Sequence, residues 1–453
     1  MSVLFFDIYL LLRWNYMDLY KNKRNICKIH IDTGDKYNFI ATLLILSYTI
    51  IRNSLSLVGI NEKISGVAII FFAYLLLSIS LVKKRSASFI PACICTAFVI
   101  IILLFNQLLH SNYGNSFSKG FAFQRGVVII IFFCGIIDNE YLNKCIYYSV
   151  YIGCIEIVFE LLEYHLNGGY WESYSDGNIR YSTYNTELGY HAAFSVIILI
   201  STLYFEKRKN LVLMMLVAVL IIISILYGSR GCLIIYVLYL LYFLFFTKRT
   251  TKKTIYIALG ISILLMICLI GFNNIVKYLI KMFEQFGFSS RTLNSYITSS
   301  EKLDSSGRDY IWAFLVDKIM DKPILGYGIF GDQFILTTEM GLHSFAHNFL
   351  LELILSFGIP IGILLFVLLV TKCVKTAKQL SGTKIGLYFI ALIIFNMGNL
   401  SVSNTYWYST RFWMMIALII WSKYNPIHKK IGDWVNQNNN LCAIPDWDGT
   451  TTQ

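Results

Sequence analysis

Residues 211–246 read LVLMMLVAVLIIISILYGSRGCLIIYVLYLLYFLFF. The stretch contains two apolar runs, 211–227 and 231–246, separated by a turn of very few residues that carries Arg230. Apolar runs of about 16 to 23 residues are long enough, or nearly so, to cross a hydrocarbon core roughly 30 Å thick. The stretch therefore predicts two neighbouring membrane spans joined by a tight turn.

Similar runs recur along almost the whole chain of 453 residues. Hydrophobic residues make up 57% of it and charged residues 14%, against about 45–50% and about 25% in soluble globular proteins. The mean hydropathy of +0.62 agrees. We expect an all-α, polytopic membrane protein with about 12 transmembrane helices, near residues 38–59, 64–82, 87–108, 121–138, 145–163, 188–205, 210–227, 231–246, 254–272, 347–370, 384–399 and 411–422.

The net charge of +12 is concentrated in short basic clusters. Each cluster follows an apolar run, as cytoplasmic loops do under the positive-inside rule, so nucleic-acid binding is a poor explanation of the charge. Alternation of twelve spans sends all of these clusters to one side and places both termini in the cytoplasm. We therefore expect a multi-pass protein of a bacterial cytoplasmic (inner) membrane, with basic clusters at Lys83, Lys84 and Arg85; Lys207, Arg208 and Lys209; Lys248, Arg249, Lys252 and Lys253; Lys372, Lys375 and Lys378; and Lys423, Lys429 and Lys430.

This topology divides the chain into three parts. Residues 1–37 form a cytoplasmic or interfacial segment, residues 38–432 the integral membrane domain, and residues 433–453 a polar cytoplasmic tail. A large extracytoplasmic loop, 273–346, interrupts the membrane domain, and a loop of this length is unusual unless it is functional. It contains helical patterns at Ile275–Phe286 and Tyr310–Met320, the second ended by Pro323, so we expect the loop to be partly helical.

Four external positions place a cation or an imidazole beside an apolar run: Arg230, Arg308, His347 with Asn348, and Arg411. Guanidinium groups bind phosphate oxygens through two parallel hydrogen bonds and stay charged at physiological pH, which suits a diphosphate. The helix start at Asn348 adds amide donors that favour an anion, and His347 can act as a general base near pH 7. The alternative is that the arginines anchor the interface and that His347 and Asn348 cap a helix.

Other ionisable groups lie deeper. Glu156, Glu160 and Glu163 occupy one face of a single span. Intramembrane charges are costly, so they mark either a functional site or a buried pair, for example Glu160 with Arg125. The external loop has no Asp-x-Asp pair, and the cysteines lack nearby histidine partners. We therefore expect no metal and no other cofactor.

The ordered motifs resemble the O-antigen polymerase and O-antigen ligase superfamily of bacterial integral-membrane glycosyltransferases. They are GSRG at 228–231, GRDYIWAFLVDKIMDKPILGYGIFG at 307–331 and HNFLLELILSFGIPIG at 347–362. The resemblance extends from about Tyr184 to Trp421. Near its start, STYNTELGY is similar to the family's Asn-Pro-Asn stretch but lacks the proline.

The resemblance implies a substrate and roles for the site residues. The donor would be an undecaprenyl-diphosphate-linked oligosaccharide in the membrane lipid, used outside the cytoplasmic membrane in lipopolysaccharide biosynthesis, with a chain-length regulator protein as a further partner. Arg230 and Arg308 would hold the diphosphate, and His347 would orient or deprotonate the acceptor hydroxyl. The rest of the substrate site would comprise Arg411 together with Asn348, Gly326 and Gly328, which shape the helix start and the loop.

Three functions share these features. A polymerase would lengthen O-antigen or capsule repeats, a ligase would transfer lipid-linked polysaccharide to lipid A core, and a flippase would only move the lipid-linked oligosaccharide. The run HNFLLELILSFG is closer to the polymerase branch, so the sequence favours polymerisation. The large external loop, and the lack of paired Gly- or Pro-broken spans, speak against a flippase.

Overall fold

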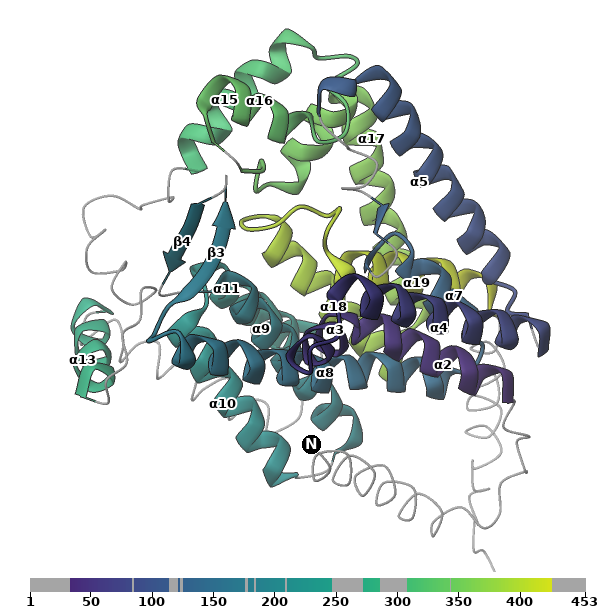
Figure 1. Cartoon of the computed structure of the whole chain (residues 1–453), viewed down its shortest axis with the longest axis horizontal. Helices are drawn as coiled ribbons and strands as arrows, with labels where there is room; N and C mark the ends of the chain where they lie inside the picture. The colour runs from purple at the N-terminus through teal and green to yellow at the C-terminus, as the bar shows by residue number, and fades with distance from the viewer. Residues whose placement is uncertain are drawn as a thin grey trace, which may run out of the picture. The chain divides into compact units, whose positions relative to one another are not determined.

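The helices of the computed structural model follow the apolar runs of the sequence (Figure 1). The structure describes residues 33–83, 85–113, 121–122, 125–175, 178–182, 185–207, 210–246, 272–285, 308–342 and 344–425. Residues 34–453 form one structural unit, separate from 1–33. The helices are α2 (Thr33–Leu46), α3 (Tyr48–Leu57), α4 (Glu62–Lys83), α5 (Phe89–Leu109), the 3-10 turn η1 (Ser111–Tyr113), α7 (Ile129–Gly135), α8 (Asn139–Leu166), α9 (Thr186–Glu206), α10 (Leu211–Tyr227), α11 (Arg230–Phe246), α13 (Phe272–Gln285), α15 (Arg308–Asp321), α16 (Gly331–Met340), α17 (Phe349–Gln379), α18 (Lys384–Leu400) and α19 (Thr410–Tyr424).

The all-α, polytopic membrane class is confirmed. Among the described residues, α4, α5, α8, α9 and α17 are long and apolar enough to cross a membrane. The predicted span at 38–59 is instead the pair α2 and α3, bent by 61°, which is either a broken span or a re-entrant loop. The number of about 12 spans stays a prediction, because the expected span at 254–272 lies outside the described residues, as do the polar tail and most of segment 1–37.

The predicted span at 121–138 is wrong. Its first half is a two-stranded hairpin, β1 (Phe121–Ala122) with β2 (Arg125–Gly126), and its second half is the seven-residue helix α7. Ile129, Phe132 and Phe133 of α7 are fully buried. The run is apolar because it fills the interior on every side, and apolarity alone does not distinguish this from lipid contact.

A second hairpin forms in the predicted loop 165–187. Strand β3 (Trp171–Ser175) pairs antiparallel with β4 (Asn178–Ser182), with Trp171 opposite Ser182. The indole of Trp171 donates a hydrogen bond to the Glu160 carbonyl oxygen, 3.2 Å away. The hairpin is therefore fixed to the end of α8.

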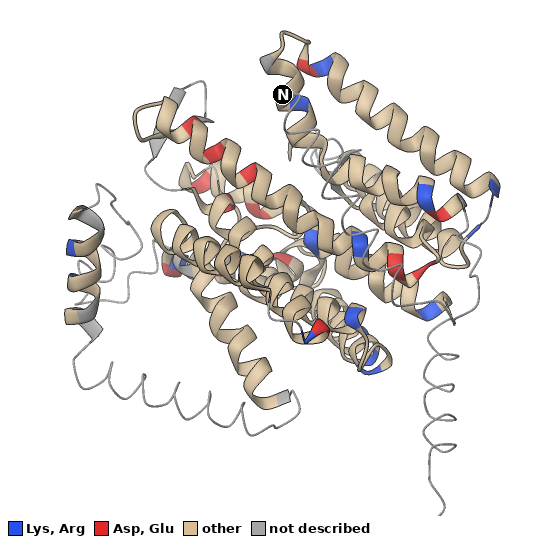
Figure 2. Cartoon of the chain, turned by 90° about the horizontal axis from the view of Figure 1, so that it is seen from below, with Lys and Arg blue, Asp and Glu red and all other residues tan. Residues whose placement is uncertain are grey.

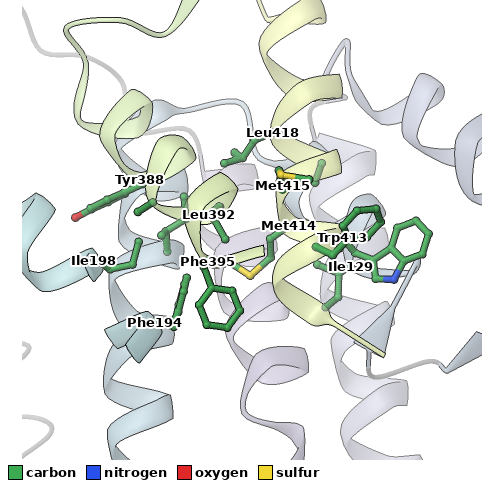
Figure 3. Packing of buried hydrophobic residues seen from close by; sticks show 14 of the residues in the cluster. Ile129, Phe194, Ile198, Tyr388, Leu392, Phe395, Trp413, Met414, Met415 and Leu418 are labelled. Atoms are coloured by element: carbon green, nitrogen blue, oxygen red, sulfur yellow. The ribbon is translucent and has the colours of Figure 1, made fainter. Parts of the chain in front are cut away.

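The largest core lies where α7, α9, α18 and α19 meet (Figure 3). Phe194 of α9 and Phe395 of α18 pack edge to face, with ring centroids 5.4 Å apart. Some polar groups in this core are paired, as burial favours: the Tyr388 hydroxyl lies 2.8 Å from the Thr202 hydroxyl. These contacts fix α9, whose first turn reaches the candidate site.

The long helices carry few charges along most of their length (Figure 2). On α4 and α5, large apolar side chains face outward instead: Phe71 is 62% exposed, Ile94 64% and Phe98 62%. A soluble surface rarely exposes so many large apolar groups together. These faces fit contact with lipid, which agrees with the membrane class.

Helix α17 is broken at Gly358, where φ is +79° and ψ is 165°. Pro360 has no N–H, so the Ser356 carbonyl, four residues earlier, loses its helical partner. The loop between α15 and α16 supplies the missing donors: the Tyr327 amide bonds the Leu355 oxygen at 2.7 Å, and the Gly328 amide bonds the Ser356 oxygen at 3.0 Å.

Helices α15 and α16 each pack against α17 (Figure 1). They enclose a separate apolar cluster, which includes Ile311, Leu315, Ile319, Ile335, Leu336 and Leu355. The expected helix at Tyr310–Met320 is α15, and it ends before Pro323 as predicted. The expected helix at Ile275–Phe286 is α13, and α16 was not predicted.

Candidate functional site

His347 is held in a conformation that few residues adopt. Its φ is +50°, in the left-handed region that costs energy for residues other than glycine. Its Nδ1 lies 3.1 Å from the Ser403 carbonyl oxygen. A carbonyl only accepts, so the hydrogen-bond network assigns the ring proton to Nδ1. Nε2 is then the basic nitrogen, and it accepts a hydrogen bond from the Ser344 hydroxyl, 2.9 Å away.

Neighbouring groups fix this turn on both sides of His347. The Ala346 amide donates to Asp332, a buried carboxylate on α16, at 2.9 Å. The Trp312 indole donates to the Ala346 carbonyl at 2.8 Å. The Asn348 side chain caps α17 by accepting from the amides of residues 350 and 351, so Asn348 serves the helix start as expected. The imidazole is therefore oriented before any substrate binds.

Arg308 lies close enough to His347 to act on its titration. Burial, and then the charge of Arg308, lower the pKa of the His347 imidazole below its ordinary 6.5. Arg308 begins α15, one helical turn before Trp312, and i and i+4 residues share a helix face. The hydrogen bond from Trp312 to Ala346 thus brings Arg308 toward His347. Two of the three predicted catalytic residues are therefore neighbours.

The turn that carries Arg230 packs directly on the start of α9. A Cβ on Gly189 would collide with the Gly228 Cα, and a Cβ on Gly231 would collide with the Tyr190 hydroxyl. Only glycine permits such close approach of backbones. Gly231 also lies against Val402, next to the carbonyl that holds His347. The backbone of Arg230 therefore reaches the same region, although its side chain lies outside the described atoms.

Gly326 and Gly328 shape the docked loop. Their φ values are +67° and +83°. A Cβ on Gly326 would lie 2.6 Å from the Leu355 oxygen, and one on Gly328 would lie 2.6 Å from Asn106 Oδ1. The amide of Gly328 is already bonded to α17. These contacts give both glycines a role in holding the loop that leads to α16 and Asp332.

Arg411 lies inside the bundle, in a different environment. Its guanidinium carbon stands 5.0 Å from the Phe194 ring centroid and 5.3 Å from that of Phe395, within cation–π range. The charge of Glu156 acts on it, and Glu156 lies 2.8 Å from His191 Nδ1. These neighbours belong to α8, α9 and α18. Aromatic rings and a carboxylate therefore surround the guanidinium, and the role of Arg411 in substrate binding stays a prediction.

Glu160 has Asn185 as a hydrogen-bond partner, and its pairing with Arg125 stays a prediction. Its Oε2 accepts a hydrogen bond from Asn185 Nδ2 at 2.6 Å, and Asn185 in turn caps α9. The side chain of Arg125, the alternative partner, lies outside the described atoms. The carboxylate thus links α8 to the first turn of α9.

Several residues of this site were missed by the sequence analysis. Tyr190 and Trp312 lie within stretches that carry the resemblance but received no role, and Asp332 and Ser403 lie outside the quoted motifs. Ser403 belongs to the loop 401–409, which is tied to α17 because Thr405 donates a hydrogen bond to the buried Glu352 carboxylate. Distant segments converge here, and a single sequence does not reveal such contacts.

The same part of the chain matches known proteins. Residues 215–367 match the family model described as O-antigen ligase. The match covers about a third of the chain and supports the resemblance to the O-antigen ligase and polymerase superfamily. The matched range contains Arg230, Arg308, and His347, so the family match covers the three predicted catalytic positions.

Curated relatives come from Rickettsia. A protein of Rickettsia conorii named "Putative polysaccharide ligase" is 26% identical over 170 residues, 34% of this chain and 40% of the relative. A protein of Rickettsia typhi with the same designation is 30% identical over 134 residues, 26% of this chain and 32% of the relative. The alignments thus span well under half of either relative. No solved structure matches the chain significantly.

Proposed function

We propose that this protein is a membrane glycosyltransferase of the ligase type, which transfers a lipid-linked polysaccharide from a diphosphate carrier to an acceptor sugar hydroxyl. One observation carries the proposal: His347 directs a basic Nε2 from a fixed ring, and Arg308 lies near it. This pairs a proton acceptor with a diphosphate-binding cation, the two groups such a transfer needs.

In the proposed reaction the acceptor hydroxyl displaces Ser344 from His347 Nε2. The hydroxyl oxygen attacks the anomeric carbon of the donor and forms the new glycosidic bond, while its proton moves to Nε2. The bond from the anomeric carbon to the diphosphate oxygen breaks, and its electron pair leaves with the lipid diphosphate. General-base catalysis of this kind contributes about 10²–10⁴-fold, and Arg308 and Arg230 would stabilise the charge that develops on the leaving group.

The charge of Arg308 has two opposite effects in this scheme. Before substrate binds, it lowers the pKa of His347, which keeps the imidazole neutral at pH 7 and ready to accept a proton. A bound diphosphate would offset that positive charge and favour the imidazolium that forms during the transfer. The base would thus become stronger only when the donor is in place.

Polymerisation is the second candidate, because the chemistry is the same and only the acceptor differs. The sequence favoured a polymerase because of one run, HNFLLELILSFG, which forms the start of α17. The family description and the designations of the relatives favour a ligase instead. We therefore place the ligase first.

A reconstituted assay would test the proposal. The purified protein in proteoliposomes would receive an undecaprenyl-diphosphate-linked polysaccharide and lipid A core. We expect polymer on the core from the wild type and none from His347→Ala. Growth of single lipid-linked repeats into chains, without transfer to the core, would favour the polymerase. Failure of both reactions would contradict glycosyl transfer.

A further inference from the structure

The hydroxyl of Tyr190 is buried without a well-aligned hydrogen bond. Tyr190 is 5% exposed, and within the part of the chain that the structure describes its hydroxyl has only the poorly aligned Ser229 and Ser403 side chains as neighbours. Two other buried tyrosines differ: the Tyr239 hydroxyl lies 2.7 Å from the Ser201 hydroxyl, and Tyr388 pairs with Thr202. Buried polar groups are nearly always paired, so an exception calls for an explanation.

This hydroxyl lies where the motif-bearing segments meet. It stands next to the side chains of Ser229, in the GSRG turn, and Ser403, in the loop 401–409. Through its carbonyl, the same Ser403 holds His347. The Tyr190 hydroxyl also lies against Gly231, adjacent to Arg230. A single phenol thus borders three of the segments that form the candidate site.

The electrostatic setting favours an anionic partner. Arg308 is near enough for its positive charge to act on Tyr190. A phenol O–H donates readily to an oxygen anion, and hydrogen bonds to charged groups are stronger than neutral ones. A diphosphate oxygen held by Arg308 would give this donor the well-aligned acceptor that the described part of the protein does not supply.

We propose that Tyr190 donates a hydrogen bond to the diphosphate of the lipid-linked donor and is therefore a substrate-binding residue. The inference rests on the proposed function, because it takes the diphosphate from that reaction. It adds a contact from α9, a helix that the motif resemblance left without any role in binding. The alternative is structural: the hydroxyl would tie Ser229 to Ser403.

A binding experiment tests the contact directly. The full-length protein in nanodiscs would be titrated with undecaprenyl diphosphate, and with undecaprenol as the probe that lacks the diphosphate. Tyr190→Phe should weaken undecaprenyl diphosphate about tenfold or more, as loss of a hydrogen bond to a charged group does. Undecaprenol should bind unchanged. Tyr239→Phe, which removes a buried hydroxyl elsewhere, should leave both affinities at the wild-type level.

Thermal unfolding of the same variants provides a second measurement. Tyr190→Phe should change the melting temperature little, because the hydroxyl has no well-aligned hydrogen bond to lose, whereas Tyr239→Phe should lower it. Wild-type affinity for undecaprenyl diphosphate in Tyr190→Phe would overturn the inference, as would a fall in melting temperature equal to that of Tyr239→Phe. If the wild type bound both lipids equally, the proposed function would fail, and the role of Tyr190 with it.

Discussion

The indole of Trp312 donates a hydrogen bond to the carbonyl oxygen of Ala346, 2.8 Å away. The bond joins residues 34 positions apart. Trp312 lies one turn after Arg308 on α15, and Ala346 directly precedes His347. The bond therefore connects the segment of Arg308, predicted to bind the diphosphate, with the segment of His347, the predicted base. Their relative position therefore depends on a residue that touches neither reacting group.

Trp312→Phe should reduce transfer activity by about tenfold or more, because small displacements of catalytic groups are costly. The loss should appear in kcat rather than in the amount of folded protein, since one neutral hydrogen bond contributes only about 1 kcal/mol. Trp421→Phe is the matched control: its indole donates to the Ile136 carbonyl at 2.7 Å in the core. Equal activities of the two variants would argue against the positioning role.

Arg308→Lys and Arg230→Lys should each lose most activity while expression stays near normal. An ammonium keeps the charge but lacks the planar fork that binds two phosphate oxygens at once. Arg52→Lys is the control, because Arg52 lies 4.0 Å from Glu62 in a half-exposed pair on α3 and α4. Full activity of both lysine variants would indicate that Arg308 and Arg230 only anchor the interface.

The acid limb of the pH–rate profile should depend on whether donor is bound. Protonation of His347 removes the base, so activity falls as the pH drops through its pKa. In free protein this pKa is lowered by burial and by Arg308, which places the limb of kcat/KM at low pH. Bound diphosphate offsets Arg308 and raises the pKa, so the limb of kcat should lie at higher pH. Coincident limbs, or a reversed order, would contradict this electrostatic account.

Features that depend on residues close together in the sequence were predicted more accurately than features that depend on distant residues. Runs such as 211–227 are apolar throughout and form a helix whether protein or lipid surrounds them. The bounds of these helices were therefore predicted closely. The run at 121–138 was misassigned because apolarity does not report whether a segment is surrounded by protein or lipid. Two helix ends were also predicted from nearby residues: Asn348 caps the start of α17, and α15 ends before Pro323.

The site was predicted only in part, because its geometry comes from long-range contacts. The order of the motifs identified Arg308 and His347 as candidates. The hydrogen bond between His347 and Ser403 joins residues 56 positions apart, and no sequence pattern around Ser403 predicts it. Arg411 was assigned to the substrate because it starts a span, like the other candidates. Its cation–π contacts with Phe194 and Phe395 arise from helix packing, which the sequence does not display.

Orientation in the membrane can be tested with two exposed positions. Thr338 lies on α16, in the loop expected outside, and Ser381 lies in the turn after the basic end of α17, expected inside. Thr338→Cys should react with a membrane-impermeant thiol reagent in spheroplasts, and Ser381→Cys should react only after lysis, each measured above the labelling of the unsubstituted chain. Labelling of Ser381→Cys from outside would reverse the orientation and place the site in the cytoplasm.

Deletion of the gene should distinguish the three functions, because each loss leaves a different lipid intermediate. Without a ligase, long polymer remains on undecaprenyl diphosphate and none reaches lipid A core. Without a polymerase, the long-chain ladder disappears and single repeats remain on the carrier or the core. Without a flippase, single repeats stay on the cytoplasmic leaflet, where external enzymes do not reach them. We expect stranded long polymer, restored to the core by the wild-type gene but not by His347→Ala. Single repeats facing outward would favour the polymerase, and repeats trapped inside would exclude glycosyl transfer as the function of this site.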